Sequence, residues 1–487
     1  MFGDYVYDKS SAAYINKLLL VDQDGLFERT GLFSAYSAHG FEVVNYWDDL
    51  TFRIEYQDML ASVDDKLVVI VKSEDYVPYD MIKRLRMYEL SLRGLFPRLN
   101  EHVLKDCSET DLDLLSDAYP KNFDDLRDEL KTEQYFRNTV YAKGNVERYV
   151  RGCLEELLTN ARQVGSYKQW FRIAEEKARL DLLAVQHELE IDSSEINALF
   201  QAYVLQQFGK LSQNIDPESP VLVSRAMDYM HSRSDKFVIV IMDGMSEFDW
   251  RLFSESFSGI QYEKSSAFAM IPSTTSISRQ CLLSNKYPSQ LTEPWKQNKE
   301  KAEFVACARS LGYSDTQIGY ERGYEAEFDS FVRCGAVIIN DVDNMVHAQT
   351  QGRVGMYHDI NLLAKQHKLR DLVNRLLEKG FDVYISADHG NTACIGLGRM
   401  MGSGVETETK SHKMVVLKDF ADKDALIQKY GLIEYPKYYL PKEFDYLICN
   451  VGESLDLKGE QVMTHGGMSI DEVIVPFVKI KAGENNG

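Results

Sequence analysis

Several apolar runs in the second half of the chain end in polar residues that can bind a metal ion. Asp243 follows the run at 237–242, and Asp388 and His389 follow the run at 381–386. Buried parallel strands have this length and this apolar character. Because ligands gather at the carboxyl ends of parallel strands, we expect these side chains to lie together at one edge of a sheet.

A second group of candidate ligands lies farther along the chain. Asp343 and His347 follow the apolar run at 336–339 and stand four residues apart, so both lie on one face if the chain turns helical there. His465 precedes two glycines, which let the backbone approach a site closely. Each residue alone also fits a structural role, such as a turn aspartate or a half-buried histidine. Together, carboxylates and imidazoles without thiolates suit zinc or manganese.

Hydroxyl groups are concentrated in one short segment between these strands. The seven residues from Pro272 to Ser278 carry five of them. A divalent cation can lower the pKa of such a hydroxyl and turn it into a nucleophile. Serine and threonine are also preferred at helix N-caps. Both interpretations can hold, because a helix N-terminus also attracts an anionic phosphate.

Size and composition predict a globular protein of several domains. The chain has 487 residues, of which 44% are hydrophobic and 27% charged, enough to build a large core. No apolar run approaches the ~20 residues that a membrane helix needs, and the N-terminus has no secretory pattern. The seven cysteines are scattered and contain no Cys-x-x-Cys pair, so we expect buried free thiols and a cytoplasmic location without membrane attachment.

The net charge of −20 limits the choice of partners. A chain this acidic repels a nucleic-acid backbone, so we expect no strong direct DNA binding by the chain alone. A small phosphorylated substrate stays possible, because bound cations can reverse the potential inside a pocket.

Local patterns divide the chain into three parts: a small α/β unit at 1–98, a helical region at 99–213 and an α/β domain at 214–487. The first part has candidate strands at 17–22, 41–46 and 66–72 and a candidate helix at 78–95. The last follows a linker at 212–220, and its strands alternate with helices, which predicts a largely parallel sheet between helical layers. Its predicted elements are strands at 237–242, 316–319, 336–339 and 381–386 and a helix at 359–379.

Four stretches carry a resemblance to a known family. They are Val-Ile-Met-Asp-Gly-Met at 240–245, Ile-Pro-Ser-Thr-Thr-Ser-Ile-Ser-Arg at 271–279, Ala-Asp-His-Gly at 387–390 and His-Gly-Gly followed by Glu and Val-Pro at 465–476. The pattern resembles the alkaline phosphatase superfamily over most of 235–480. Within that superfamily it is most similar to the PglZ domain family, which is associated with bacterial phage-defence (BREX) loci.

The resemblance implies two metal sites in an alkaline-phosphatase-like domain at 214–487. One would hold Asp243, Asp388, His389 and the nucleophile. The other would hold Asp343, His347 and His465. The superfamily nucleophile stands last in Pro-[Ser/Thr]-x-Thr, which is Thr275 here, with the adjacent Thr274 as the alternative. Some members place an asparagine just after the nucleophile; this chain has Arg279 nearby, a candidate phosphate clamp because a guanidinium matches phosphate oxygens, or else an exposed helix arginine.

The implied activity is hydrolysis of a phosphoester by a Thr275 nucleophile and two divalent ions, zinc or manganese. The superfamily contains both monoesterases and diesterases, and the resemblance favours phosphodiester or nucleotide-type substrates. It also implies a role in bacterial anti-phage defence, with protein partners bound through the N-terminal and helical regions.

Two alternatives compete with this interpretation. The segment Asp22-Gln-Asp24-Gly25 resembles the nucleophile loop of haloacid-dehalogenase-type phosphotransferases, but the rest of that family's pattern is not evident, and a simple turn explains it as well. The chain could also be a non-catalytic scaffold of a defence complex, with a metal site that only stabilises it. All seven predicted metal-site residues would be present in either case.

Overall fold

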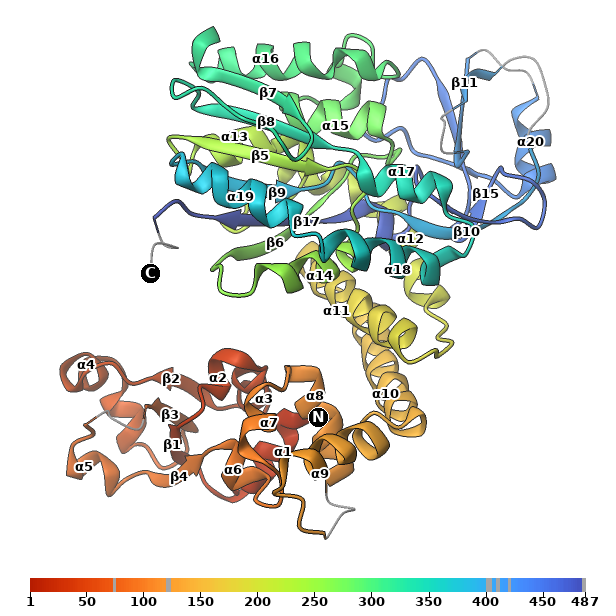
Figure 1. Ribbon diagram of the computed structural model, residues 1–487. Coiled ribbons are helices and arrows are strands. Elements are labelled where there is room, and N and C mark those ends of the chain that lie inside the picture. The colour runs from red at the N-terminus through yellow and green to blue at the C-terminus, as the bar shows by residue number, and fades with distance from the viewer. Residues whose placement is uncertain (73–75, 120–123, 400–404, 409–411, 419–421, 484–487) are drawn as a thin grey trace. The chain divides into compact units, whose positions relative to one another are not determined.

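A computed structural model describes residues 1–487 except 73–75, 120–123, 400–404, 409–411, 419–421 and 484–487 (Figure 1). The chain separates into two compact units, Met1–Arg151 and Gly152–Gly487. The helix α10 (Lys143–Arg162) crosses the division. Compactness groups part of the helical region with each unit, and the three-part division at 98 and 213 stays a prediction.

The first unit is built on a parallel four-stranded sheet with the order β2-β3-β1-β4. Its central strand β3 is buried along its whole length, as its β-branched sequence predicts. The three predicted strands are confirmed: β1 (Lys17–Asp22), β2 (Glu42–Asn45) and β3 (Leu67–Val71). The helix α1 (Phe2–Lys9) precedes β1, and the helices between the strands are α2 (Leu26–Arg29), α3 (Leu32–Ala38) and α4 (Asp49–Ala61).

The single helix predicted at 78–95 is wrong. The segment contains α5 (Tyr79–Ile82), the edge strand β4 (Arg86–Leu90) and α6 (Leu92–Leu95). Arginine, methionine, glutamate and leucine favour helices, but here parallel pairing with β1 decides the backbone conformation. Tertiary contacts of this kind routinely override local propensity.

The predicted helical character of the middle region is confirmed. The helices α7 (Glu101–Lys105), α8 (Glu109–Ala118) and α9 (Glu129–Tyr135) near the end of the first unit are short. The helices α11 (Tyr167–Gln186) and α12 (Ser194–Gln207) in the second unit are longer and carry apolar faces.

The second unit contains a six-stranded sheet with the order β6-β17-β9-β5-β8-β7. Strands β5, β7, β8 and β9 are parallel, while β17 runs antiparallel to both β9 and β6. Helices lie on both faces of this mixed sheet, so the expected α/β architecture is confirmed (Figure 1). The strands are β5 (Phe237–Met242), β6 (Glu263–Phe268), β7 (Ile318–Arg322), β8 (Cys334–Ile339), β9 (Asp382–Ser386) and β17 (Ile474–Ile480).

Helices connect these strands, and one prediction among them needs correction. The expected helix at 359–379 is two helices, α18 (Gly352–Ala364) and α19 (Lys368–Glu378), because His367 takes a left-handed conformation with φ 57°. The others are α13 (Ala226–His231), α14 (Glu247–Ser254), α15 (Thr275–Ser284), α16 (Glu300–Ser310), α17 (Asp341–Ala348), α20 (Lys423–Tyr430) and α21 (Ile470–Val473).

Two smaller sheets complete the second unit, with the orders β15-β10-β16 and β11-β12-β14-β13. Strand β16 leads directly to His465. The strands are β10 (Thr392–Gly396), β11 (Val405–Glu408), β12 (Met414–Leu417), β13 (Ile433–Glu434), β14 (Asp445–Ile448), β15 (Glu453–Ser454) and β16 (Gln461–Thr464).

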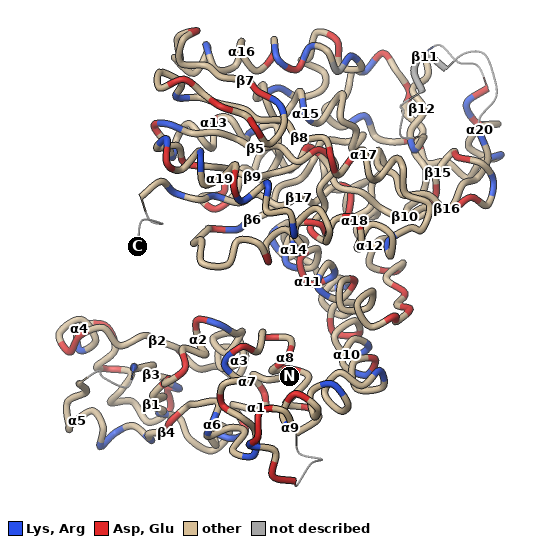
Figure 2. The backbone as a smooth tube through the Cα atoms, viewed as in Figure 1, with Lys and Arg blue, Asp and Glu red and all other residues tan. Residues whose placement is uncertain are grey.

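Three features bear on the expectations from composition. All seven cysteines are free and buried, as expected. Within the described ranges, no helix has the length and apolarity to span a membrane. Acidic and basic residues are interspersed along the described parts of both units (Figure 2).

A buried ion-pair cluster joins α11 to the C-terminal motif. Lys177 Nζ lies 2.9 Å from both carboxylate oxygens of Asp471 and 2.8 Å from Asp181 Oδ2. Arg353 Nη2 contacts the same Asp471 at 3.3 Å. The side chains of Lys177, Asp181 and Asp471 are at most 10% exposed and Arg353 is 17% exposed, so the buried charges depend on one another for compensation.

We therefore expect Lys177→Met to destabilise the second unit by about 3–5 kcal/mol, because it leaves two carboxylates buried with one fewer cation. Urea unfolding followed by the fluorescence of the buried Trp170 and Trp250 would measure the change. Lys168→Met is the matched control on the same helix, since Lys168 is 46% exposed where it pairs with Asp216; its cost should stay below about 1 kcal/mol. Equal costs for the two variants would contradict the role assigned to the buried pair.

Candidate metal centre

The first group of predicted ligands meets at the carboxyl ends of two adjacent parallel strands. Asp243 follows β5, and Asp388 and His389 follow β9. One ligand atom from each lies within 4.8 Å of the others. All three residues are buried, and the Gly244 N–H donates to Asp388 Oδ1 at 3.3 Å, which ties the two strand ends together.

The Thr275 hydroxyl lies beside this group. Thr275 is the first residue of α15, and its Oγ1 is 3.3 Å from Asp243 Oδ1 and 3.1 Å from His389 Nε2. The preceding Thr274 occupies the N-cap position but makes no side-chain capping hydrogen bond. The hydroxyl-rich segment thus begins a helix and also brings one hydroxyl to the candidate metal site.

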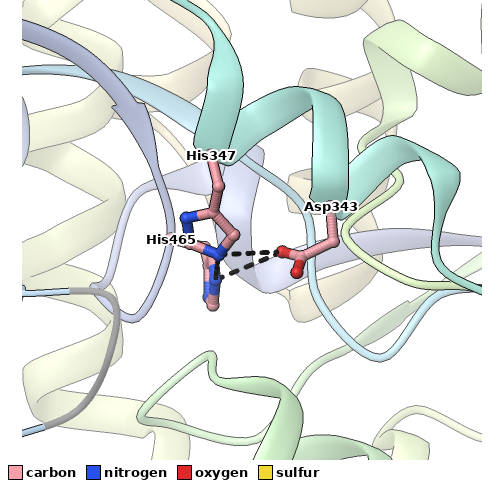
Figure 3. Close-up of side chains that lie close together, drawn as sticks. All are labelled: Asp343, His347 and His465. Carbon is pink, nitrogen blue, oxygen red and sulfur yellow. Dashed lines mark hydrogen bonds and ion pairs between the residues drawn. The ribbon is translucent and has the colours of Figure 1, made fainter.

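The second group comes from α17 and the segment after β16 (Figure 3). Asp343 Oδ1 lies 3.5 Å from His347 Nε2 and 3.4 Å from His465 Nε2, and the two imidazole nitrogens are 3.4 Å apart. The helical turn at 341–348 is what brings residues 343 and 347 to one face, as their spacing predicts. All seven predicted metal-site residues therefore lie in or beside two compact clusters, while their roles as ligands stay predictions.

The two clusters are in direct contact. The imidazole rings of His389 and His465 stack with their centroids 4.0 Å apart and an interplanar angle of 13°. The Asp343 N–H donates to the Asp243 backbone oxygen at 3.0 Å, so α17 begins against the end of β5. The arrangement provides two neighbouring sets of candidate ligands rather than two separate sites.

The donor atoms fit divalent cations. Asp343 Oδ1 and Asp388 Oδ2 are buried and have no hydrogen-bond partner among the described residues, which is costly for a carboxylate unless another group compensates it. His389 Nδ1 lies 3.0 Å from the Gly390 oxygen and His465 Nδ1 lies 2.9 Å from the Ser273 oxygen. Donation from Nδ1 in each ring would leave the Nε2 lone pair facing the cluster, the usual arrangement of a histidine ligand.

Burial, together with crowded negative charge, shifts the pKa values of the ionisable groups in the site. Burial, followed by the charge of Asp243, raises the pKa of Asp388 to about 7 and also raises the pKa of Asp343. Burial lowers the pKa of His465 well below its usual value. For His389, burial acts in the same direction, but the charges of Asp388 and Asp243 outweigh it and raise its pKa. A divalent cation would relieve the repulsion between the carboxylates.

Arg279 is buried beneath the first cluster, so an exposed helix arginine is the wrong description. Its Nη1 donates to Asp243 Oδ2 at 2.5 Å and its Nε to Glu300 Oε2 at 2.6 Å. Nη2 is buried and has no hydrogen-bond partner among the described residues. The carboxylate contacts favour a positioning role, and direct binding of a phosphate by Arg279 stays a prediction.

Sequence reasoning missed two residues that support the ligands. Asn391 Nδ2 donates to the Gly244 oxygen at 2.9 Å and to Asp249 Oδ2 at 2.6 Å, which links the two strand ends a second time. Its position directly after Asp388-His389-Gly390 could have identified it from the sequence as a residue near the site. Glu300 holds Arg279 and accepts from the Tyr320 hydroxyl at 2.6 Å. Only the fold brings it there, from 21 residues beyond Arg279 in the chain.

The C-terminal motif fixes the backbone around the site. Glu472 accepts from the Gly467 N–H at 2.8 Å and from the Ser469 hydroxyl at 2.6 Å, and it pairs with buried Lys413 at 2.9 Å. A Cβ at Gly390 would lie 1.9 Å from the Asp471 oxygen, so only glycine allows this approach. The glutamate of the motif thus shapes the loop that carries His465.

The rival motif at the end of β1 has a structural explanation. The two carboxylate oxygens of Asp22 accept from the backbone N–H groups of Leu26 and Phe27, each at 2.9 Å. Asp24 Oδ2 accepts from the Leu92 N–H at 2.7 Å. Both side chains therefore satisfy the first N–H groups of short helices, which supports the turn interpretation.

Comparison with solved structures finds matches over half of the chain at low sequence identity and low TM-score. Murine ectonucleotide pyrophosphatase/phosphodiesterase 5 in complex with AMP is 11% identical, with a TM-score of 0.37 over 50% of this chain and 87% of that chain. Phosphonoacetate hydrolase from Sinorhizobium meliloti in complex with phosphonoformate is 12% identical, with a TM-score of 0.32 over 50% of this chain and 90% of that chain. No curated protein matches the sequence.

Comparison with protein families gives a specific result. The model of the BREX system PglZ alkaline phosphatase-like domain matches residues 222–480, more than half of the chain. The match spans the six-stranded sheet from β5 to β17 and every residue of both ligand clusters. It confirms the resemblance of the sequence motifs, and the chain belongs to the PglZ family of alkaline phosphatase-like domains.

Proposed function

We propose that the chain is a metal-dependent phosphoester hydrolase with Thr275 as the nucleophile. The observation that carries this proposal is the place of the Thr275 hydroxyl, 3.1 Å from His389 Nε2 and 3.3 Å from Asp243 Oδ1, at the start of a helix and beside two sets of candidate ligands. The family match supports a phosphoester substrate.

Different residues would bind the metal ions and attack the substrate. Asp243, Asp388 and His389 would hold one divalent ion, and Asp343, His347 and His465 the other. Zinc or manganese in these sites would lower the pKa of the Thr275 hydroxyl and offset the charge of the phosphate. Thr275 Oγ1 attacks phosphorus, and its bond to phosphorus forms as the bond to the leaving oxygen breaks. Water then hydrolyses the phosphothreonine and restores the hydroxyl.

The helix start supplies substrate contacts of its own. Because Thr274 makes no side-chain cap, the first backbone N–H groups of α15 stay available for phosphate oxygens. Phosphodiester or nucleotide-type substrates suit this site, and a monoester stays the alternative. The family's description supports a part in a BREX-type defence system. We further propose that the chain works in the cytoplasm and binds protein partners through residues 1–213.

Arg279 and Glu300 act as positioning residues in this proposal. Glu300 is buried, pairs with Arg279 at 2.6 Å and is itself held by Tyr320 and Arg322. Arg279 in turn holds one oxygen of Asp243, which leaves the other directed at Thr275. Residues that orient a ligand in this way typically change metal affinity ~10–100-fold when they are replaced.

Thr275→Ala should abolish hydrolysis of a chromogenic phosphodiester, with a loss of about 10³-fold or more, because no other group replaces the nucleophile. The test measures metal content beside hydrolysis of a diester and a monoester. Near two ions per chain should remain in the variant, since six ligands are intact.

Thr274→Ala is the control for the choice between neighbouring hydroxyls, because Thr274 Oγ1 is buried with no hydrogen-bond partner among the described residues. Its activity should stay within a few-fold of wild type. If activity survived in Thr275→Ala and disappeared in Thr274→Ala, the nucleophile would be Thr274 instead of Thr275. A fully metallated wild type without turnover, alone or with partners, would instead favour the scaffold alternative.

Glu300→Gln should weaken zinc binding at the first site about tenfold, because it removes the charge that holds Arg279 against Asp243. Competition with a chromogenic chelator measures this without reference to activity. Glu303→Gln is the matched control, since Glu303 is also buried on α16 but pairs with Lys286 at 2.6 Å. Equal zinc affinity in Glu300→Gln and wild type would contradict the positioning role proposed for Glu300.

A further inference from the structure

The first unit exposes a cluster of large apolar side chains around the start of α4. Trp47, Leu50 and Ile54 are 81%, 71% and 76% exposed. Leu50 and Ile54 stand four residues apart on one side of α4, and Trp47 lies two residues before the helix begins. Phe33 on α3 is 46% exposed and lines the same cavity as Trp47. Scattered exposed apolar residues are ordinary, but a contiguous group often marks a binding surface.

A small cavity lies beside this cluster. It has a volume of about 210 Å³, and its lining includes Phe33, Trp47 and Tyr56 together with Asp48 and Glu55. The volume is below the ~300–1,000 Å³ of typical ligand pockets, so it suits a single inserted side chain. The cavity lies where β2 ends in the parallel sheet, the edge at which such sheets bind their ligands.

The lining carries negative charge that no cation in the described structure compensates. Asp48 and Glu55 take part in none of the ion pairs between described residues, and no lysine, arginine or histidine lines the cavity. Arg53 is nearby in sequence but pairs with Asp49 and Asp80 instead. Asp48 Oδ1 caps α4 by accepting from the Thr51 N–H at 2.9 Å, which leaves its charge in place.

Aromatic rings and uncompensated carboxylates together select a cation. A guanidinium or ammonium group is attracted to the face of tryptophan or tyrosine and to nearby carboxylates. The apolar surface of Leu50 and Ile54 beside the cavity would cover the apolar neighbours of that cation. A protein segment can supply both a positive charge and apolar side chains beside it. A free small cation would fill the cavity but leave the apolar side chains exposed.

We propose that Phe33, Trp47, Leu50 and Ile54 form a docking surface for a partner protein, which inserts an arginine or lysine side chain into the cavity lined by Asp48 and Glu55. The surface is independent of the hydrolase proposal, since it lies in the first compact unit and shares no residue with the metal ligands. It gives the first unit a role in assembly rather than in chemistry.

Fluorine NMR on the full chain labelled with 5-fluorotryptophan tests this proposal. The chain has four tryptophans, and the resonance of Trp47 is identified by its loss in Trp47→Phe. The probe is N-acetyl-Leu-Arg-Leu-amide, compared with the same peptide carrying citrulline in place of arginine. We expect a saturable shift of the Trp47 resonance with the arginine peptide and at least tenfold weaker binding of the citrulline peptide.

Variants separate the charge from the apolar surface. Asp48→Asn with Glu55→Gln should weaken binding of the arginine peptide at least fivefold, while asparagine keeps the helix cap. Val63→Glu is the control, since Val63 is 84% exposed in the same unit and lies outside the cavity lining; it should leave binding unchanged. Equal affinities for the arginine and citrulline peptides, or no saturable shift, would overturn the proposal.

The main rival occupant is a second copy of the chain. Light scattering with size-exclusion chromatography should give the mass of one chain for wild type and for Ile54→Glu. A wild-type dimer that Ile54→Glu converts to a monomer would assign the surface to self-association and overturn the partner assignment. Thr275→Ala should bind the arginine peptide as wild type does, so failure of either proposal can be recognised separately.

Discussion

Repulsion among three carboxylates at the edge of the large sheet governs the structure of the second unit around its site. Asp243, Asp343 and Asp388 converge there, and Asp243 and Asp388 are almost fully buried. A buried carboxylate without a counter-charge is strongly unfavourable. The surrounding arrangement of imidazoles, guanidinium and backbone N–H groups, together with the proposed divalent ions, is what makes this convergence possible.

Each compensating group comes from a different element. Arg279 reaches Asp243 from α15, and Glu300 on α16 fixes Arg279. Asn391 joins the ends of β5 and β9 through the Gly244 oxygen. His465 approaches from β16 and stacks on His389. Because the support is distributed over so many segments, a change far from the candidate ligands in sequence can still alter the geometry of the two clusters.

The two units divide the chain by chemistry as well as by compactness. In the first unit the acidic motif Asp22-Gln-Asp24-Gly25 satisfies backbone N–H groups, and three of the large exposed apolar residues, Trp47, Leu50 and Ile54, lie in or just before the first turns of α4. In the second, α11 is fastened to the C-terminal motif through Lys177 and Asp471. The helical region is thus partly a structural component of the phosphatase-like domain.

The sequence by itself determined the set of candidate ligands and the parallel strands β5, β7, β8 and β9 of the large sheet. Apolar runs that end in Asp243 or Asp388 predict strands and ligands together, because burial and the carboxyl edge of a parallel sheet act on neighbouring residues. The spacing of Asp343 and His347 predicted their common face. Short-range signals also predicted Thr275 beside a helix start, since hydroxyl-rich segments favour that position.

Tertiary structure alone decided the rest. Pairing with β1 turned 86–90 into a strand against its helical propensity. Folding also brought Glu300 to Arg279 and closed α17 onto β5 through the Asp343 N–H. None of these contacts is local in sequence, so no propensity or spacing encodes it. They form because buried polar groups must find partners, and which partner is within reach depends on how the elements pack.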